Sequence, residues 1–490
     1  MALLKMKQFI KNPNIILIVI FLEGFVSISI EILTIRQVIP VAGTSIIVTS
    51  LIIGIFLLFL AIGYWRGGLY RDNFTSILRR NFIIAAGLMG IGISYPFIAY
   101  FFVTLEHYIA TSNFLFILTA YLLLIIAPII YLIGQTVPLS MNLMNPDKRI
   151  AETGGKVLFL STLGSFLGAP LASLLFMEFF GVAWSVFINF SILIIMVFLF
   201  SKKTKERLLY IILAAGIGWF VYKLNISFEK EHFIATTNFA NYSVSDGVAP
   251  DSGWKGKILE SNNAYSSFIN DKKETFLYNE LIKRILFKDL KLHDAQILVL
   301  GAGGFTLSAG GTHGNYFTYV DIDPKIKSVV EKRFLPKING KFIAQDARIY
   351  LIKHLRQYDV IVSDVCSNLF SIPPSLLTRE YFSNIKDSLK TNGFAIFNIV
   401  ARPFLNDPYS KRVDSTIRSV FGNCISIPLQ YSDRLTNIIY VCRASKNAHD
   451  KEVYTDNLNT GTLDFIVLQR GSYSNVLRVF HKKNTLNATK

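Results

Sequence analysis

The chain changes character near residue 226, and this change constrains its fold more than any other feature. Before it, apolar runs long enough to cross a bilayer follow one another. After it, short apolar stretches of strand length alternate with helical patterns. The apolar excess, 52% of residues with a mean hydropathy of +0.42, is therefore uneven. The sequence predicts a polytopic α-helical membrane domain over 1–225, followed by a soluble α/β part.

The membrane half contains seven apolar runs of roughly the 20 residues that a bilayer requires. The first run carries Glu23, Glu31 and Arg36, and charges at that depth face protein or water. They indicate either a polar path for a substrate or, as we favour, an ion pair between Glu31 and Arg36 that locks the helices. The predicted spans lie near 14–34, 46–64, 82–104, 115–139, 157–179, 181–201 and 208–224. Small residues that predict close helix packing are Gly155, Gly164, Gly168 and Ala169.

The net charge of +17 arises largely from basic clusters that flank the apolar runs. This arrangement is typical of membrane anchors and gives no reason to expect a nucleic-acid partner. The positive-inside rule places the N-terminus and the loops 65–81, 140–156 and 202–207 in the cytoplasm of a multi-pass inner-membrane protein. Seven spans then put the soluble part outside, although nucleotide-type cofactors are kept inside. The side of the membrane stays open at this point.

The soluble half alternates strand and helix patterns, which predicts a doubly wound parallel sheet. Ligands of such sheets bind at the carboxyl ends of the strands. The predicted strands lie at 297–301, 316–324, 341–347, 358–364 and 393–400, with helices at 325–333, 348–356 and 377–390. A connecting segment with short strands precedes this domain at 226–257. The α/β domain itself spans 258–455, and 456–490 form a C-terminal extension.

Glycines and aspartates stand at the predicted strand ends. Glycines let the backbone approach a cofactor closely, and a carboxylate after the second strand accepts hydrogen bonds from ribose hydroxyls. The alternative for any single aspartate is a helix N-cap or a turn. The residues are Gly301, Gly303 and Gly304 after the first strand, Asp321 and Asp323 after the second, Asp346 after the third and Asp364 after the fourth.

The glycine-rich segment differs from a dinucleotide-binding fingerprint, because Thr306 stands where that motif needs its third glycine. The sequence therefore favours a cofactor held through its nucleoside, without a pyrophosphate on a helix N-terminus. The cysteines Cys366, Cys424 and Cys442 lack metal-ligand spacing, and their odd number argues against a disulfide framework. The seven histidines are scattered, so we expect no metal.

The order of motifs over 258–445 resembles that of spermidine synthase, an aminopropyltransferase with the fold of S-adenosylmethionine-dependent methyltransferases. The motifs are ILESNNAYSSFIND, ETFLYNELI, LVLGAGG, YVDIDP, AQDARIYL, YDVIVSD and IPPSLLTREYF. The N-terminal stretch EGFVSISIEILTIRQVIPVAG and the later LAIGYWRGG are similar to the membrane region of bacterial spermidine synthase-like proteins with fused transmembrane segments.

This resemblance implies roles for individual residues. Asp321 would bind the ribose hydroxyls, Asp346 with Ala347 beside it would contact adenine, and Asp364 would deprotonate or orient the attacking amine. The glycine-rich turn at 301–304 would lie against the donor, which is decarboxylated S-adenosylmethionine or S-adenosylmethionine itself. The residues implied for the acceptor site are Tyr265, Tyr278, Glu280 and Ser367.

Several positions depart from the family's pattern. Gly304 and Ser367 stand where the family has acidic residues that hold amines, Ser266 replaces a glutamine, and Asn279 replaces the histidine between Tyr278 and Glu280. Polyamines are cations, so the loss of carboxylates weakens the expectation of a polyamine acceptor. The fused membrane half instead favours an acceptor, or a product, that is associated with the bilayer.

The sequence thus predicts a membrane-bound transferase that alkylates an amine or another nucleophile from an adenosylated sulfonium donor, with Asp364 as the base. Two alternatives remain. One is a methyltransferase acting on a membrane-associated acceptor, and the other is a non-catalytic nucleoside sensor that controls a transporter-like membrane domain. The lipid bilayer and a small-molecule or lipid-associated acceptor are the expected partners, and a homodimer is compatible with the sequence.

Overall fold

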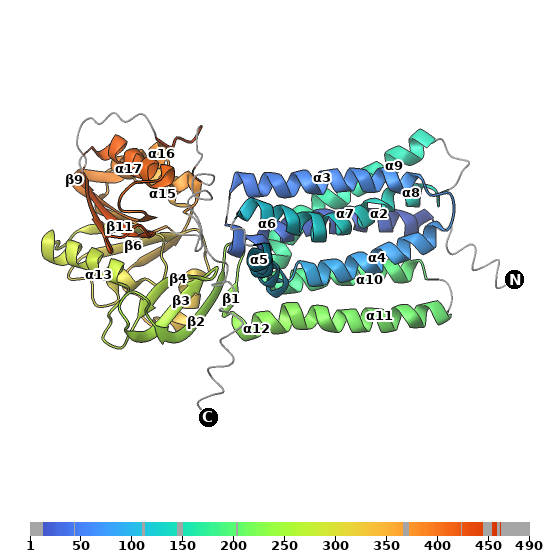
Figure 1. Cartoon of the computed structure of the whole chain (residues 1–490), viewed down its shortest axis with the longest axis horizontal. Coiled ribbons are helices and arrows are strands. Elements are labelled where there is room, and N and C mark those ends of the chain that lie inside the picture. The colour runs from blue at the N-terminus through green and yellow to red at the C-terminus, as the bar shows by residue number, and fades with distance from the viewer. Residues whose placement is uncertain are drawn as a thin grey trace, which may run out of the picture.

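The computed structural model describes residues 13–43, 45–109, 113–144, 150–201, 204–365, 372–422, 424–443, 453–457 and 461. They form a long helical bundle and an α/β domain, which lie end to end (Figure 1). The bundle is therefore in contact with the domain through one of its two ends only. We refer to these as the domain end and the distal end of the bundle.

Seven helices of the described chain are long and apolar enough to cross a membrane. These spans are Asn14–Ala42, Ile46–Gly68, Phe74–Gly92, Phe114–Met141, Ala151–Phe180, Val182–Leu199 and Thr204–His232. The corresponding elements are α2 (Pro13–Ala42), α3 (Ile46–Gly68), α4 (Phe74–Gly92), α6 (Phe114–Tyr121) with η1 (Leu122–Ile126), α7 (Ala127–Gly134) and α8 (Thr136–Met141), α9 (Ile150–Pro170) with η2 (Leu171–Phe180), α10 (Val182–Leu199), and α11 (Thr204–Tyr222) with η3 (Lys223–Ser227) and α12 (Phe228–His232). The structure thus has as many helices of membrane-span length as the sequence predicted.

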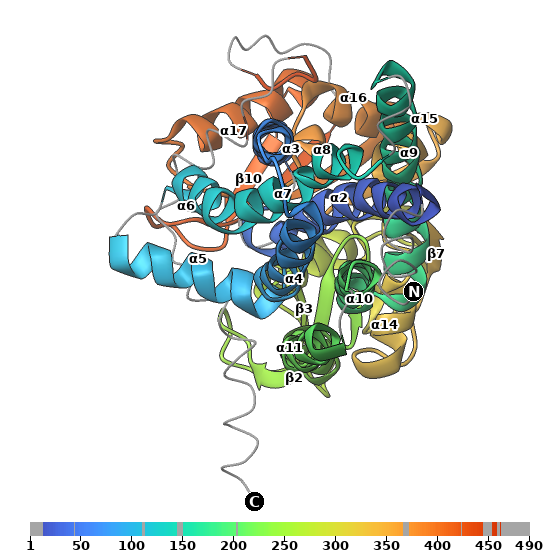
Figure 2. The same ribbon diagram turned by 90° about the vertical axis from the view of Figure 1, so that its right-hand side faces the viewer.

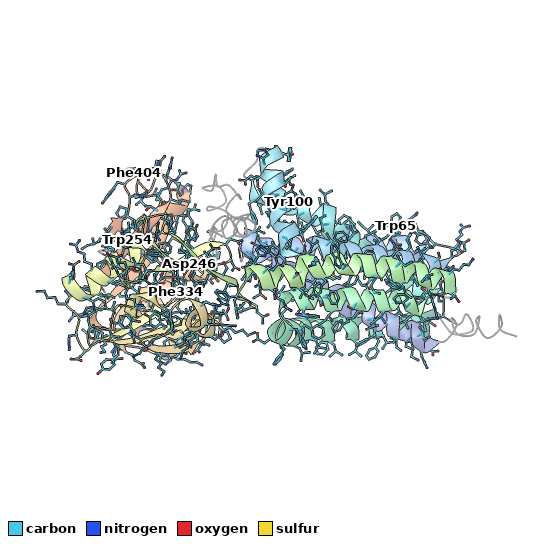
Figure 3. All side chains as sticks on the ribbon, turned by 90° about the horizontal axis from the view of Figure 1, so that it is seen from below. Trp65, Tyr100, Asp246, Trp254, Phe334 and Phe404 are labelled. Carbon is cyan, nitrogen blue, oxygen red and sulfur yellow. A yellow bond between two sulfur atoms is a disulfide. The ribbon has the colours of Figure 1, made fainter. Side chains whose placement is uncertain are left out.

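The third span was predicted at the wrong place. It begins at Phe74 and ends at Gly92, and a separate helix α5 (Tyr95–Ile109) follows. Pro96 explains the break, because proline lacks a backbone donor and is tolerated only in the first turn of a helix. Helix α5 runs crosswise to the long helices at the domain end (Figure 2), and its exposed Tyr100 projects from the bundle (Figure 3).

Close contact between α2 and α9 confirms part of the predicted small-residue packing. A Cβ added at Gly164 would lie 2.0 Å from the carbonyl oxygen of Phe21, and one at Gly168 would lie 2.5 Å from that of Phe25. Glycine is therefore required where the two backbones meet. Gly155 has open space around it and takes no part in this packing.

We expect Gly164→Ala to lower the free energy of unfolding by about 1–3 kcal/mol, because the added methyl group must push α2 and α9 apart. Thermal unfolding of the full chain in detergent measures this effect. Gly155→Ala is the matched control on the same helix and should leave the midpoint unchanged, since no atom lies within 4 Å of the added carbon. Equal midpoints for the two variants would contradict the packing argument.

The ionisable residues of α2 are not paired as predicted. Arg36, which is buried, donates from Nε to the Thr237 carbonyl oxygen at 2.6 Å and from Nη2 to Asn241 Oδ1 at 2.7 Å. The favoured ion pair with Glu31 is thus wrong, because the guanidinium turns toward the α/β domain. Glu23 lies deep in the bundle, where it accepts a hydrogen bond from Ser161 at 2.9 Å.

The α/β domain contains a small antiparallel sheet and a larger mixed sheet. The small sheet has the order β1 (Ala235–Thr236), β2 (Asn241–Val248), β3 (Lys255–Ser261) and β4 (Ala264–Ile269). The large sheet has the order β10-β11-β9-β8-β5-β6-β7, where β5 is Gln296–Leu300, β6 Tyr316–Asp321, β7 Lys341–Ala344, β8 Tyr358–Ser363, β9 Leu389–Ala401, β10 Cys424–Pro428 and β11 Thr436–Arg443.

All five predicted strands are present, and helices cover the large sheet as expected. Its strands β5 to β9 are parallel, whereas β10 and β11 add an antiparallel edge that the sequence did not predict. A mixed sheet of this order is the methyltransferase-like architecture. The helical elements are α13 (Leu277–Arg284), η4 (Ile285–Asp289), η5 (Thr306–Ser308), α14 (Ile326–Arg333), α15 (Ala347–Lys353), η6 (Pro374–Leu376), α16 (Arg379–Ser388) and α17 (Pro408–Phe421).

The antiparallel edge contains a disulfide between Cys424 and Cys442, which face each other across β10 and β11. The odd number of cysteines had argued against such a bond. The odd number of cysteines does not exclude a disulfide, because two of the three pair between neighbouring strands. The third, Cys366, lies outside the described residues. The bond fastens the edge strand β10 to the sheet.

Candidate active site

The carboxyl ends of the central strands bring most of the predicted residues to one edge of the large sheet. Strands β8, β5, β6 and β7 are consecutive neighbours in it, and all of them run in the same direction. Gly301 and Asp364 directly follow β5 and β8, and Asp321 is the last residue of β6. This edge is where parallel sheets bind their ligands.

Asp364 is held by hydrogen bonds on both carboxylate oxygens. Tyr278 donates to Oδ2 at 3.2 Å, and Asn398 Nδ2 donates to Oδ1 at 2.8 Å. Asn437 in turn donates to the amide oxygen of Asn398 at 2.8 Å. Desolvation raises the pKa of Asp364 above the usual carboxyl range, although these two hydrogen bonds oppose the shift. A carboxylate that is fixed in place and more basic than usual is suited to accept a proton.

The glycine-rich turn packs against the backbone of Asp364. Gly301 has φ +87°, and a Cβ there would lie 2.2 Å from the Asp364 carbonyl oxygen, so only glycine fits. Asp321 closes the other side of the turn, since its two oxygens accept from the backbone N–H groups of Ala302 and Asp323, both at 2.9 Å. Each carboxylate oxygen keeps a further lone pair for a ligand hydroxyl.

Asp346 follows β7 and caps helix α15. Its Oδ1 accepts from the backbone N–H groups of Arg348 at 2.9 Å and of Ile349 at 3.0 Å. The alternative of a helix N-cap is therefore realised for this aspartate, and Ala347 is the first residue of the helix. Gln345, the residue before Asp346, donates its backbone N–H to the Asp321 carbonyl oxygen at 2.8 Å, so the start of α15 lies beside the end of β6.

The predicted acceptor residues are only partly brought together. Tyr278 contacts Asp364, whereas half-buried Tyr265 packs its ring against Phe276 at 6.5 Å between centroids.

Glu280 does not face Asp364: it accepts hydrogen bonds from Thr275 and Lys283. Burial opposes its ionisation, yet these hydrogen bonds and the lysine charge lower its pKa. Glu280 thus fixes its own helix. Ser367 lies outside the described residues, and among those residues no cluster of metal-ligating side chains is found.

Gly304 is enclosed in a way that explains its identity. Its N–H donates to Ser267 Oγ at 2.8 Å, and a Cβ would lie 2.4 Å from the Phe334 ring and 2.7 Å from Ser267 Cβ. The aspartate that the resemblance leads one to expect here has no room. A donor's side-chain amine must therefore find its partners elsewhere.

Gly304→Asp should lower the free energy of unfolding by about 1–3 kcal/mol, because a larger side chain overpacks this position. Circular dichroism during thermal unfolding measures the loss. Gly310→Ala serves as control in the same loop region, since the nearest atom to its added carbon, Lys273 Cβ, is 4.0 Å away. An unchanged midpoint for Gly304→Asp, together with tighter donor binding, would show that the loop can open to restore the acidic contact.

Three asparagines of the site were not predicted. Asn398 on β9 bonds Asp364, and Asn437 on β11 bonds Asn398. Both come from strands that are far away in the sequence, so no local motif signals them. Asn279 donates to Thr306 of the glycine-rich segment through a short hydrogen bond. Its position between Tyr278 and Glu280 was noticed only as a departure from the family pattern.

Donor binding should weaken as the pH falls below about 6. Desolvation raises the pKa of Asp321 to about 6, with the backbone hydrogen bonds opposing this shift and the charge of Asp323 adding to it. If ribose hydroxyls donate to the ionised carboxylate, as the resemblance implies, its protonation removes an acceptor. Calorimetric titration with methylthioadenosine from pH 5 to pH 8 measures the midpoint. A flat profile across that range would contradict a role for ionised Asp321.

Comparison with known proteins agrees with this geometry. The profile of the spermine/spermidine synthase domain matches residues 275–451. The polyamine aminopropyltransferase of Vibrio vulnificus is 29% identical over 150 residues, which are 29% of this chain and 48% of that protein. The polyamine aminopropyltransferase of Oceanobacillus iheyensis is 24% identical over 311 residues, 56% of this chain and 58% of that protein. The chain thus spans about half the length of these relatives.

Solved structures include a probable spermidine synthase from Corynebacterium glutamicum, with a TM-score of 0.35 at 17% identity over 49% of this chain and 89% of that one. Spermidine synthase from Thermotoga maritima has a TM-score of 0.35 at 14% identity, over 48% of this chain and 84% of its own. The profile match and the sequence relatives, together with the site, define the class: the α/β domain is aminopropyltransferase-like. Over residues 275–451 this domain is similar to the spermine/spermidine synthase domain.

Proposed function

We propose that this chain is a membrane-bound transferase that alkylates an amine from an adenosylated sulfonium donor, with Asp364 as the proton acceptor. The observation that carries the proposal is the fixed, basic carboxylate of Asp364 beside the glycine turn and the Asp321 carboxylate. These groups supply the needs of an in-line displacement: a nucleoside anchor, positioning and a base.

In the proposed reaction the lone pair of the acceptor nitrogen attacks the carbon next to the sulfonium sulfur. The carbon–sulfur bond breaks with its electron pair going to sulfur, which leaves as a neutral thioether. The proton that the alkylated nitrogen loses passes to Asp364. Tyr278 and Asn398 keep the carboxylate aimed at the nitrogen through their hydrogen bonds. With decarboxylated S-adenosylmethionine the group transferred is aminopropyl, and the thioether is methylthioadenosine.

The acceptor in this proposal is associated with the membrane. The support is that the end of β6 rests on the bundle: Lys325, four residues after Asp321, forms a 2.9 Å ion pair with Glu178 of η2 and donates to its carbonyl oxygen at 2.7 Å. The turn after β3 touches the bundle as well, since Tyr95 donates to Asn263 at 2.6 Å. The bundle, with its seven apolar helices, would lie in a cell membrane directly below the site.

Methyl transfer from S-adenosylmethionine is the second candidate. The observation that favours it is the closed space at Gly304, which removes the carboxylate that the family pattern assigns to the aminopropyl amine. In this case the same nitrogen attack would release S-adenosylhomocysteine.

Purified full-length protein in detergent should be given each donor, first with putrescine and then with a membrane lipid extract. Mass spectrometry of the products identifies both the donor and the acceptor. Thioether release with decarboxylated donor and lipid extract is the expected result. Efficient spermidine formation from putrescine alone would overturn the membrane-associated acceptor, and no turnover in any arm by a folded protein would overturn the transferase.

A further inference from the structure

Basic residues distinguish the two ends of the bundle. The connections at the distal end, between α3 and α4, α8 and α9, and α10 and α11, carry many lysines and arginines. At the domain end, the connections 43–45, 93–113 and 181 contain none. Among the described residues, the basic ones at or near the distal end are Arg66, Arg71, Arg79, Arg80, Lys156, Lys205 and Arg207.

The few cations near the domain end do not reverse this bias. Arg36 is buried against the α/β domain, which leaves Lys223 and Lys230 near the end of the last bundle helix. Lysine and arginine in short loops stay in the cytoplasm, whereas a large folded domain is translocated largely regardless of its charge. The distal end is thus the cytoplasmic end by this rule.

The disulfide between Cys424 and Cys442 is a second and independent observation. Disulfides persist in oxidising compartments and are rare in the cytosol, where thiols are kept reduced. The bond lies in the α/β domain, far along the chain from the bundle's basic loops. Two unrelated physical signals therefore agree about the side on which the domain lies.

We infer that the α/β domain lies on the extracytoplasmic face of the membrane. A site on that face can only act on a donor and an acceptor that are present there. Because sulfonium nucleosides are charged and are made inside cells, an export step must precede the transfer. The acceptor would be met in the outward-facing leaflet or in the space beyond it.

Variants that each carry one introduced cysteine, in a Cys366→Ser background that keeps Cys424 and Cys442, test this orientation in the full chain. Asp72→Cys places a thiol in the exposed connection between α3 and α4, and Lys272→Cys places one in the exposed turn after β4. In sealed spheroplasts a membrane-impermeant maleimide should label position 272 and should reach position 72 only after lysis. The reverse pattern, or equal labelling of both positions, would overturn the proposed orientation.

The state of the native cysteines gives a second measurement that does not depend on activity. Rapid alkylation of cells that carry the Cys366→Ser variant should find Cys424 and Cys442 blocked until a reductant is added. Free thiols at both positions in untreated cells would contradict an outward domain. Neither measurement requires a donor, so failure of the orientation is distinct from failure of the proposed transferase.

A different set of contacts carries a second inference, which rests on the proposed donor site. Arg36 of α2 donates to the Thr237 carbonyl oxygen, and the Thr237 hydroxyl donates to Asp323 Oδ2 at 2.5 Å. Tyr242 donates to the same oxygen at 2.9 Å, and the backbone N–H of Asp323 donates to Asp321. A continuous chain of hydrogen bonds therefore joins a bundle helix to the carboxylate proposed to hold the ribose.

The geometry points to Arg36 as a positioning residue for Asp321. Arg36 is 3% exposed, and its guanidinium is anchored to Thr237, which follows β1, and to Asn241, which begins β2. Loss of its charge would release the segment before β2, and with it the contacts that hold Asp323. Donor affinity would then depend on the position of helix α2 in the membrane.

Arg36→Gln should weaken methylthioadenosine binding by roughly tenfold, the loss expected for charged hydrogen bonds. Arg36→Lys should restore part of the affinity. Arg79→Gln is the matched control, because it removes another buried arginine, one that pairs with the partly exposed Glu206 at the distal end. Equal affinity in wild type and Arg36→Gln would overturn the positioning role, whereas a wild type that binds no donor would overturn the donor site itself.

Hydrogen exchange supplies a readout that needs no donor. The backbone amide of Asp323 should exchange faster in Arg36→Gln than in wild type, because its hydrogen-bonded neighbours are released. The same amide should be unaffected by Arg79→Gln, even where the two variants lower the unfolding midpoint equally. Unchanged exchange at Asp323 in Arg36→Gln would overturn the proposed connection.

Discussion

Asp364→Asn should reduce the transfer rate by about 10²–10⁴-fold while donor affinity is nearly unchanged. The amide keeps the shape of the carboxyl and can retain the hydrogen bond from Tyr278, but it cannot accept the proton of the attacking amine. Desolvation raises the pKa of Asp364, so in the wild type the acid limb of the rate profile should lie above the usual carboxyl range. The variant should lack that limb.

Single-turnover kinetics with a labelled donor across pH 5 to 9 measure both effects. Asp359→Asn is a suitable control, since Asp359 stands on the same strand β8 near its opposite end and bonds Gln296 and Lys390. It should leave the pH profile of the rate unchanged. Wild-type rates in Asp364→Asn would remove this residue from the reaction.

Asp321→Ala should weaken donor binding by about 1.5–3 kcal/mol, the range for hydrogen bonds to a charged group. This corresponds to roughly 10- to 150-fold in the dissociation constant. The change also frees the N–H groups of Ala302 and Asp323, which loosens the turn around the donor. Calorimetry with S-adenosylmethionine, its decarboxylated form and methylthioadenosine measures the loss.

Glu331→Ala controls for a lost carboxylate on the following helix α14, where Glu331 forms only a long 3.9 Å pair with Lys327. Its donor affinity should equal that of the wild type. Since the two donors and methylthioadenosine share the nucleoside, Asp321→Ala should affect the binding of all three alike. A loss confined to one donor would mean that Asp321 contacts the side chain of the donor and not its ribose.

Local pattern predicted the central part of the domain well, because buried parallel strands leave apolar runs that end in glycine or aspartate. Gly301, Asp321 and Asp364 lie where this reasoning placed them. Asn398, which bonds Asp364, and Asn437, which bonds Asn398, were missed because only the order of strands in the sheet brings them to the site. Asp346 could not be assigned a role from the sequence, because an aspartate that caps a helix and one that binds a ligand stand at the same place after a strand.

The bundle shows how tertiary contacts override local patterns. The apolar run that was predicted as one span at 82–104 is divided by Pro96 into an upright helix and a crosswise one. Arg36 and Glu31 are close in sequence, yet the guanidinium is used between domains. The disulfide between β10 and β11 could not be predicted from the number of cysteines, because it depends on the register that places Cys424 opposite Cys442.

The crosswise helix α5 has a consequence for which molecules can react. With the bundle in a bilayer, a helix at this depth with exposed Tyr100 and Tyr108 would lie in the headgroup layer, where tyrosine is favoured. It would hold Asp364, the proposed base, at a set height above the lipid tails. Acceptors would then be sorted by how far their nitrogen stands out of the membrane, and not only by their chemistry.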